Sequence, residues 1–122
     1  MTQLTRMNPD GPNGALEPIS VVDPATVIDG EAQEKGACFM GDGGEKIIVG
    51  VWESTAYAEV FSGEGYPDDE FCQVLNGTAT LTDAVGNAQS FDAGDSYVIS
   101  KGWCGEFRVS EGFKKYYVVS AS

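Results

Sequence analysis

The chain has 122 residues, enough for one domain with a sizeable core, and its 42% hydrophobic content is ordinary for a globular protein. Its formal net charge of −12 argues against nucleic acid or an anionic membrane surface as a partner. No apolar run is long enough to span a bilayer, and the N-terminus lacks the basic start and apolar core of a secretory signal, so we expect no membrane partner.

Three cysteines, Cys38, Cys72 and Cys104, stand far apart in the sequence. Their number is odd and their spacing is not that of a zinc site. Reduced thiols in a cytoplasmic protein are the simplest interpretation, so we expect a cytoplasmic location.

Residues 1–36 are expected to form an N-terminal arm with an edge strand, ahead of a main domain over residues 37–122. The first 18 residues are rich in Asn, Asp, Gly and Pro and predict an extended segment. The apolar run at 19–22 predicts an edge or swapped strand. Pairing with a second subunit would protect this edge, which suggests a homodimer, whereas the alternative is an arm packed on its own barrel. Residues 29–36 are charged and predict a loop or a single helical turn.

The rest of the chain predicts short strands separated by turns that contain Gly and Asp. The expected strands cover residues 38–40, 46–54, 56–61, 70–75, 78–82, 89–91, 96–100, 106–109 and 113–119. Sixteen glycines and five prolines fit such a chain, and no helix longer than a turn or two is expected. Strands that recur every eight to twelve residues or so indicate an all-β sandwich or barrel.

The segment 70–77 has the clearest strand pattern. Glu70 and Cys72 alternate with Phe71, so the carboxylate and the thiol should share one face. Apolar residues on both faces predict a strand that is covered on both sides. Asn76-Gly77 predicts a tight hairpin turn into the strand at 78–82.

Two motifs carry a family resemblance. Glu70 is followed after six residues by Gly77, and a second motif opens at Gly94 and continues to Gly102. This spacing resembles the cupin superfamily, which implies an all-β jelly roll, the double-stranded β-helix of RmlC-like cupin barrels. The segments 50–54, 70–77, 93–95 with 101–102, and 114–118 together are similar to the ureidoglycine aminohydrolase-type (Cupin_3) group of small cupins.

The chain departs from the family at the metal site. Cupin enzymes usually hold a metal with three histidines and the Glu of the first motif, but this chain has no histidine. Ser100 and Gly105 replace the Pro and the His of the second motif. The upstream His positions fall on Gly63 and Gly65, or on Glu64 and Tyr66 if the loop is one residue shorter. Glu70 alone matches a ligand position, and a catalytic transition metal needs about three protein ligands. We therefore predict no cofactor, with a weakly bound divalent metal left open.

Glu70 is the leading catalytic candidate, with Tyr66 and Tyr117 as its polar partners. An apolar wall in the barrel mouth would raise the pKa of Glu70 and suit it to act as a general acid or base. Alternatively, Glu70 is a relic of the metal site that hydrogen bonds from Tyr or backbone groups now hold.

A further set of side chains is expected to bind a ligand near Glu70. These residues are Trp52, Glu53, Tyr57, Cys72, Lys101, Trp103, Phe107 and Lys115. The nearby carboxylate should raise the pKa of Cys72 and oppose a nucleophilic role. Lys115 could pair with Glu70 or Glu53, meet an anionic ligand, or be a solvated surface lysine.

Two hypotheses for function follow. The first is a metal-free protein that binds a small molecule in a pocket around Glu70, or an accessory protein without catalysis. The second is an enzyme that resembles ureidoglycine aminohydrolase or the ethanolamine-utilisation cupin, with Glu70 as its proton-transfer group.

Overall fold

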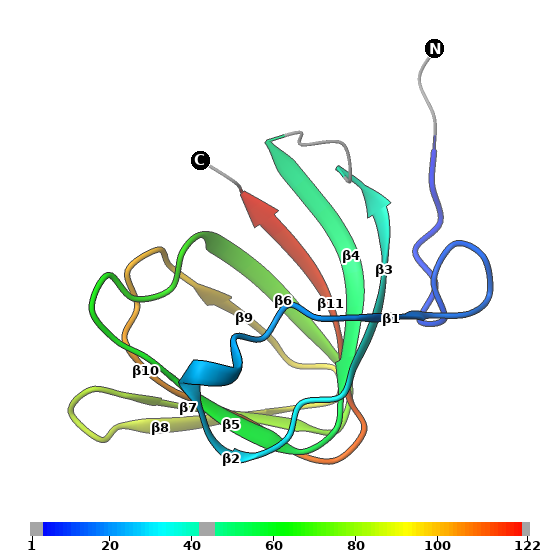
Figure 1. The fold of residues 1–122 in the computed structure, drawn as a ribbon. Coiled ribbons are helices and arrows are strands. Elements are labelled where there is room, and N and C mark those ends of the chain that lie inside the picture. Colours follow the sequence, from blue (N-terminus) through cyan, green and yellow to red (C-terminus); the bar gives the residue numbers. More distant parts are fainter. Residues whose placement is uncertain (1–3, 42–45, 121–122) are drawn as a thin grey trace.

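A computed structural model describes residues 4–41 and 46–120 as two antiparallel β-sheets packed face to face (Figure 1). The six-stranded sheet has the order β1 (Glu17–Ile19), β3 (Glu34–Met40), β4 (Ile47–Ser54), β11 (Phe113–Ser120), β6 (Asp69–Asn76) and β9 (Ser96–Ile99). The five-stranded sheet has the order β2 (Val27–Gly30), β5 (Tyr57–Phe61), β10 (Gly105–Val109), β7 (Thr78–Asp83) and β8 (Ala88–Asp92). This architecture confirms the all-β jelly roll.

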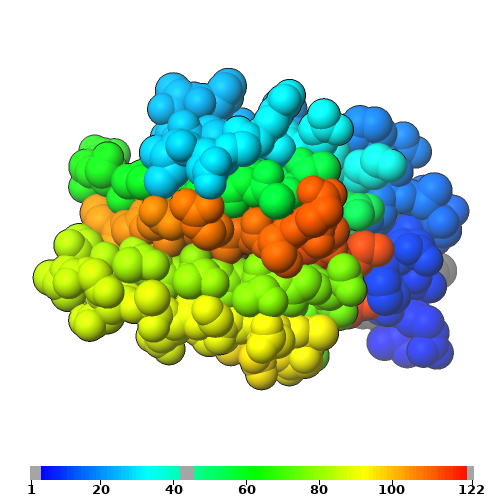
Figure 2. All heavy atoms as spheres, turned by 90° about the horizontal axis from the view of Figure 1, so that it is seen from below, coloured from blue at the N-terminus to red at the C-terminus, as the bar shows by residue number. Residues whose placement is uncertain are grey.

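The strand order of the smaller sheet is visible from outside the molecule. Figure 2 shows its bands from cyan through green, orange and yellow-green to yellow, which is the order β2-β5-β10-β7-β8. Within the described residues the helical structure is limited to one 3-10 turn, Pro24–Thr26, which connects β1 to β2. No helix in this part of the chain has the length and hydrophobicity needed to cross a membrane.

Residues 29–36 differ from the loop or helical turn expected there. They contain the end of β2, which pairs with β5, and the first residues of β3, which pairs with β4. Pairing with distant strands outweighs the local charged composition, a common outcome for β structure. The edge strand is also displaced, because β1 covers Glu17–Ile19 rather than the apolar run at 19–22.

The chain does not form a hairpin at Asn76-Gly77. β6 and β7 belong to different sheets, so the chain crosses from one sheet to the other at this point. Gly77 has a φ of 77°, but no non-glycine residue among those described has a positive φ, so Asn76 does not adopt the hairpin turn geometry. A Cβ at Gly77 would lie 2.8 Å from Ser110 Oγ and 3.1 Å from the Cα of Phe113. The crossing therefore favours glycine for both conformation and space.

Strand β6 is covered on one face only. Glu70, Cys72 and Val74 are buried, whereas Phe71 and Gln73 are exposed on the opposite face. The alternation predicted from the sequence is confirmed, but the expectation that both faces are covered is wrong. The N-terminal arm lies over another part of this sheet, where Lys114 Nζ donates a hydrogen bond to the carbonyl oxygen of Pro9. An antiparallel sheet tolerates one solvated face.

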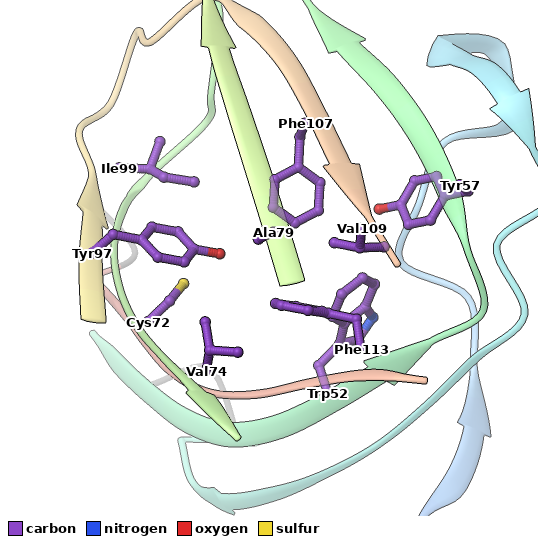
Figure 3. Packing of buried hydrophobic residues seen from close by; sticks show 10 residues of the cluster. All are labelled: Trp52, Tyr57, Cys72, Val74, Ala79, Tyr97, Ile99, Phe107, Val109 and Phe113. Carbon is purple, nitrogen blue, oxygen red and sulfur yellow. The ribbon is translucent and has the colours of Figure 1, made fainter. Parts of the chain in front are cut away.

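The core lies between the two sheets. Figure 3 shows its buried side chains converging from both sheets, with an aromatic group at one end. There, the Trp52 ring centroid lies 6.0 Å from that of Phe113 and 6.5 Å from that of Phe107. Phe113 is fully buried, and burying such a side chain contributes about 2–3 kcal/mol. This packing fixes the inward faces of β4, β10 and β11, which also supply the site described next.

Candidate functional site

A cavity of about 560 Å³ opens between the sheets. The segment 19–26, called here the N-terminal strap, forms one wall of it. The other lining residues are Ile48, Trp52, Tyr57, Glu59, Phe61, Gly65, Tyr66, Pro67, Asp68, Glu70, Phe107, Lys115, Tyr117 and Val119. A volume in this range suits a small molecule.

Glu70 is the most connected polar group in this cavity. Its Oε1 accepts a hydrogen bond from the Tyr66 hydroxyl at 2.6 Å. Its Oε2 lies 2.6 Å from Lys115 Nζ and accepts a bond from Cys72 Sγ at 2.9 Å. Both charged side chains are 8% exposed, so this is a buried ion pair. The shared face of Glu70 and Cys72 is confirmed.

The expected direction of the Glu70 pKa is wrong. Burial by itself raises the pKa of this carboxyl, but the Lys115 ammonium and the hydrogen bonds from Cys72 and Tyr66 outweigh it and hold the pKa below its ordinary value. The sequence argument considered an apolar wall and did not place a cation against the carboxylate. Glu70 is therefore ionised at neutral pH, and a proton-transfer role would be that of a base.

Lys115 is buried rather than a solvated surface lysine. Burial works against its charge, but the nearby Cys72 and Glu70 side chains keep its pKa well above the ordinary value. Its Nζ also lies 5.2 Å from the Trp52 ring centroid and 5.6 Å from that of Phe107, within cation–π range. A lysine held protonated is not an amine nucleophile.

Cys72 is an unreactive thiol. Burial, together with the charge of Glu70, raises its pKa to about 12 although Lys115 works in the opposite direction. The expected rise is therefore confirmed. Since the thiolate is the nucleophilic form, Cys72 acts here as a hydrogen-bond donor to Glu70.

The two tyrosines named as partners both line the cavity. Burial raises the pKa of Tyr66, so its hydroxyl remains a donor to Glu70. Burial likewise raises the pKa of Tyr117. The Tyr117 ring lies over Gly50, where a Cβ would overlap its hydroxyl, which explains why strand β4 has a glycine at this point.

The remaining candidates divide into two groups. Trp52, Tyr57 and Phe107 line the cavity with Glu70. Glu53, Lys101 and Trp103 do not line it. Glu53 follows Trp52 on β4 and so faces outward, while Trp103 lines a smaller cavity of about 130 Å³ beside β8 and β9.

Three inward-facing polar groups were missed by the sequence analysis. Glu59 lines the cavity between Tyr57 and Phe61, and the alternation of a carboxylate with two aromatics on one strand was the available signal. Glu34 accepts a hydrogen bond from Trp52 Nε1 at 2.9 Å, but it fell in a predicted loop. Tyr97 stands opposite Cys72, and its hydroxyl is buried without a partner among the described residues (Figure 3).

Glu34 also fixes the N-terminal strap. Its carboxylate accepts hydrogen bonds from the backbone N–H groups of Val21 and Val22 at 3.2 to 3.3 Å. Thr26 Oγ1 donates to Glu59 at 3.0 Å, so the strap is held at two points. Side chains from both sheets thus fix one wall of the cavity.

Residues 43–117 match the EutQ-like cupin domain family. This match covers more than half of the chain. The chain belongs to this cupin family.

Solved structures share the fold at low identity. A Pseudomonas syringae protein of unknown function is 23% identical with a TM-score of 0.76 over 85% of this chain. The Clostridium difficile EutQ protein is 20% identical (TM-score 0.60, 75% of this chain), and a Salmonella typhimurium protein named for ethanolamine utilization is 19% identical (0.60, 88%). The match spans 43%, 66% and 96% of those three chains, respectively. No curated protein matches the chain significantly.

The residues of this cupin do not fit a transition metal. Of the ligand set that the family resemblance implies, only Glu70 is present, and its oxygens already accept hydrogen bonds from Tyr66 and Lys115. Within residues 4–41 and 46–120, no three His, Cys, Asp or Glu side chains come together as a metal-binding group. A buried ammonium at 2.6 Å from the carboxylate would repel a second cation there.

Proposed function

We propose that this cupin binds a small molecule, without a metal, in the cavity around Glu70. The observation that carries the proposal is the buried ion pair of Glu70 and Lys115 in the wall of a cavity of about 560 Å³, with Tyr66 bonded to the same carboxylate. Tyr66 and Glu70 are neighbours in the sequence, and Lys115, 45 residues from Glu70, converges on the same space. A small number of polar groups in a cavity with aromatic walls is typical of ligand sites.

The desolvation cost of burying the Glu70–Lys115 ion pair supports a role for the pair other than stability. A buried ion pair is often no more stabilising than apolar residues of similar volume, because desolvation offsets the attraction. Leu and Met in place of Glu70 and Lys115 would therefore give the protein about the same stability. A pair placed where it faces a cavity does, however, provide fixed donors and acceptors for a ligand.

Melting temperature with a panel of small amines, alcohols, carboxylates and ureides tests this proposal. We expect at least one class to raise the melting temperature of the wild type, and Glu70→Gln to reduce that shift. Glu53→Gln is the matched control, because Glu53 lies on β4 outside the cavity lining. Equal shifts for the wild type and Glu70→Gln would show that Glu70 is not a binding group.

An enzyme is the second candidate, and the bond of 2.6 Å between Tyr66 and Glu70 favours it. The ionised Glu70 would accept a proton from the substrate while Tyr66 donates its hydrogen bond to the Glu70 carboxylate. An activity like that of ureidoglycine aminohydrolase or the ethanolamine-utilisation cupin would have to use these groups, since the residues do not fit a metal. Release of ammonia from ureidoglycine, and phosphoryl transfer between ATP and acetate, by the wild type and by Glu70→Gln test this. Neither activity in the wild type, or undiminished activity in Glu70→Gln, argues against it.

A further inference from the structure

The charged residues that line the cavity are strongly unequal in sign. Four are carboxylates and one is an ammonium group; they are Asp23, Glu59, Asp68, Glu70 and Lys115. Lys115 is neutralised by Glu70 at 2.6 Å. None of the ion pairs found in residues 4–41 and 46–120 involves the other three carboxylates. The cavity therefore carries an excess of negative charge that no side chain in the described residues balances.

Glu59 is the most buried of these three unbalanced carboxylates. It is 6% exposed and lies on β5, in the sheet opposite Glu70. Its Oε2 accepts a hydrogen bond from the Tyr57 hydroxyl at 2.6 Å, and its Oε1 accepts one from Thr26 Oγ1 at 3.0 Å. Both donors are neutral. A buried carboxylate is usually matched by a cation, so this position is prepared for one that the protein itself does not supply.

The aromatic rings that line the cavity with Glu59 also favour a positively charged ligand. The Tyr57 ring centroid lies 6.3 Å from that of Phe107 and 6.4 Å from that of Trp52, and all three rings line the cavity. Aromatic faces attract cations. The protein's own ammonium already uses them, since Lys115 Nζ lies over the Trp52 and Phe107 rings.

We propose that the ligand of this cavity is a small organic cation, a protonated amine or amidine with an apolar body, whose charged group binds Glu59. This inference rests on the proposed function and names the class of ligand. The apolar body lies against Trp52, Tyr57 and Phe107. The Glu59 carboxylate has about four acceptor positions, so it can bind an ammonium while it keeps the bonds from Tyr57 and Thr26.

Three probes of nearly the same size test the class: 2-phenylethylamine, 2-phenylethanol and 3-phenylpropanoate. Their affinities are measured by titration calorimetry on the full chain at neutral pH. We expect the amine to bind about tenfold more tightly than the alcohol, and the carboxylate to bind most weakly, since a charge-assisted hydrogen bond is about twice as strong as a neutral one. If the alcohol or the carboxylate binds as tightly as the amine, the inference is overturned while the proposed binding function stands. If no probe binds and none of the wider panel shifts the melting temperature, both are overturned.

Glu59→Gln locates the charge that selects the amine. We expect this substitution to weaken binding of the amine about tenfold and to leave the affinity for the alcohol unchanged. Glu31→Gln is the control, because Glu31 is exposed and does not line the cavity. An unchanged amine preference in a folded Glu59→Gln protein would overturn the assignment. Should Glu59→Gln fail to fold, Asp68→Asn must reduce the amine preference by lowering the same charge excess, and an unchanged preference there overturns the proposal.

Discussion

Lys115 Nζ lies 2.6 Å from Glu70 Oε2, and the two side chains are buried together between the sheets. Each holds the other in its charged form. The pKa of Glu70 is lowered and that of Lys115 is raised, although burial opposes both shifts. The pair is therefore a fixed dipole across the physiological pH range, and this has measurable consequences for stability.

Removing one member of the pair should be far more costly than removing both. We expect Lys115→Met to lower the free energy of unfolding by about 3–5 kcal/mol, because it leaves the Glu70 carboxylate buried without a cation. The double variant Lys115→Met, Glu70→Leu should recover most of this loss. Urea denaturation of the three proteins measures both differences.

Lys114→Met is the matched control for that experiment. Lys114 is the preceding residue on β11, and its ion pair with Asp10 at 3.5 Å is on the outer face of the sheet. Lys114 also bonds the N-terminal arm at Pro9, so we expect a loss of about 1 kcal/mol, well below that of Lys115→Met. Equal losses for the two lysine variants would contradict the account of a buried pair.

The same pair predicts how stability depends on pH. Because the folded pKa of Glu70 is below its ordinary value of 4.5, its contribution is present above pH 4.5 and is lost as the pH falls through the folded pKa. Because the folded pKa of Lys115 is raised, its contribution is present below pH 10.5 and is lost as the pH rises through the folded pKa. The stability difference between the wild type and Glu70→Gln should therefore be flat around neutrality and narrow in acid. Urea midpoints at a series of pH values check this, and a constant difference in acid would refute it.

The three cysteines should react at different rates with a thiol reagent. Cys72 is buried and its pKa is about 12, whereas Cys38 and Cys104 are partly exposed. We expect Ellman's reagent to label Cys38 and Cys104 in the folded protein and Cys72 only after denaturation. Mass spectrometry of the labelled peptides identifies the sites. Rapid native labelling of Cys72 would show that the core around Glu70 is more open than the structure indicates.

Glu34 should control the order of the N-terminal strap. Its carboxylate accepts bonds from Trp52 Nε1 and from the Val21 and Val22 N–H groups. We expect Glu34→Ala to destabilise the protein by about 1–3 kcal/mol, since the buried indole N–H loses its acceptor. Hydrogen exchange at Val21 and Val22 should become faster, and Glu17→Ala, an exposed substitution on β1, should leave it unchanged.

Gly77 and Gly86 separate the steric cost of a side chain from its conformational cost. Both have positive φ, but a Cβ at Gly77 meets Ser110 and Phe113, whereas a Cβ at Gly86 meets nothing within 4 Å. We expect Gly86→Ala to cost about 1–2 kcal/mol of stability and Gly77→Ala to cost more. Equal losses in thermal denaturation would mean that the sheet crossing adjusts to the extra methyl group.

The sequence predicted the inward faces of strands well and the pairing of strands poorly. The alternation in 70–75 placed Glu70 and Cys72 together, because a period of two is a local property of the backbone. It did not predict that β6 and β7 lie in different sheets. Pairing partners are decided by distant packing, and Asn76-Gly77 is a turn signal in either arrangement.

The sequence predicted part of the cavity lining, including Glu70 and Lys115, but not its electrostatics. Glu70 and Lys115 are 45 residues apart, so the sequence could not decide whether Lys115 pairs with Glu70, with Glu53, with a ligand or with none of them. Once the ammonium lies against the carboxylate, the sign of the Glu70 pKa shift reverses. Glu59 escaped notice for the same reason. Its neutral partner Thr26 is 33 residues away, and only the fold shows that no ion pair among the described residues includes Glu59.

The Lys114-Lys115-Tyr116-Tyr117 segment of β11 contains the same two residue types on each face of the sheet. A slip of this strand by one position would put a lysine and a tyrosine into the barrel again, so these four side chains hardly distinguish the correct alignment from its neighbour. Phe113, which is fully buried, would be pushed to the outside by such a slip. The apolar side chain of Phe113 at the start of the strand, rather than the polar side chains that line the cavity, thus fixes the register of β11.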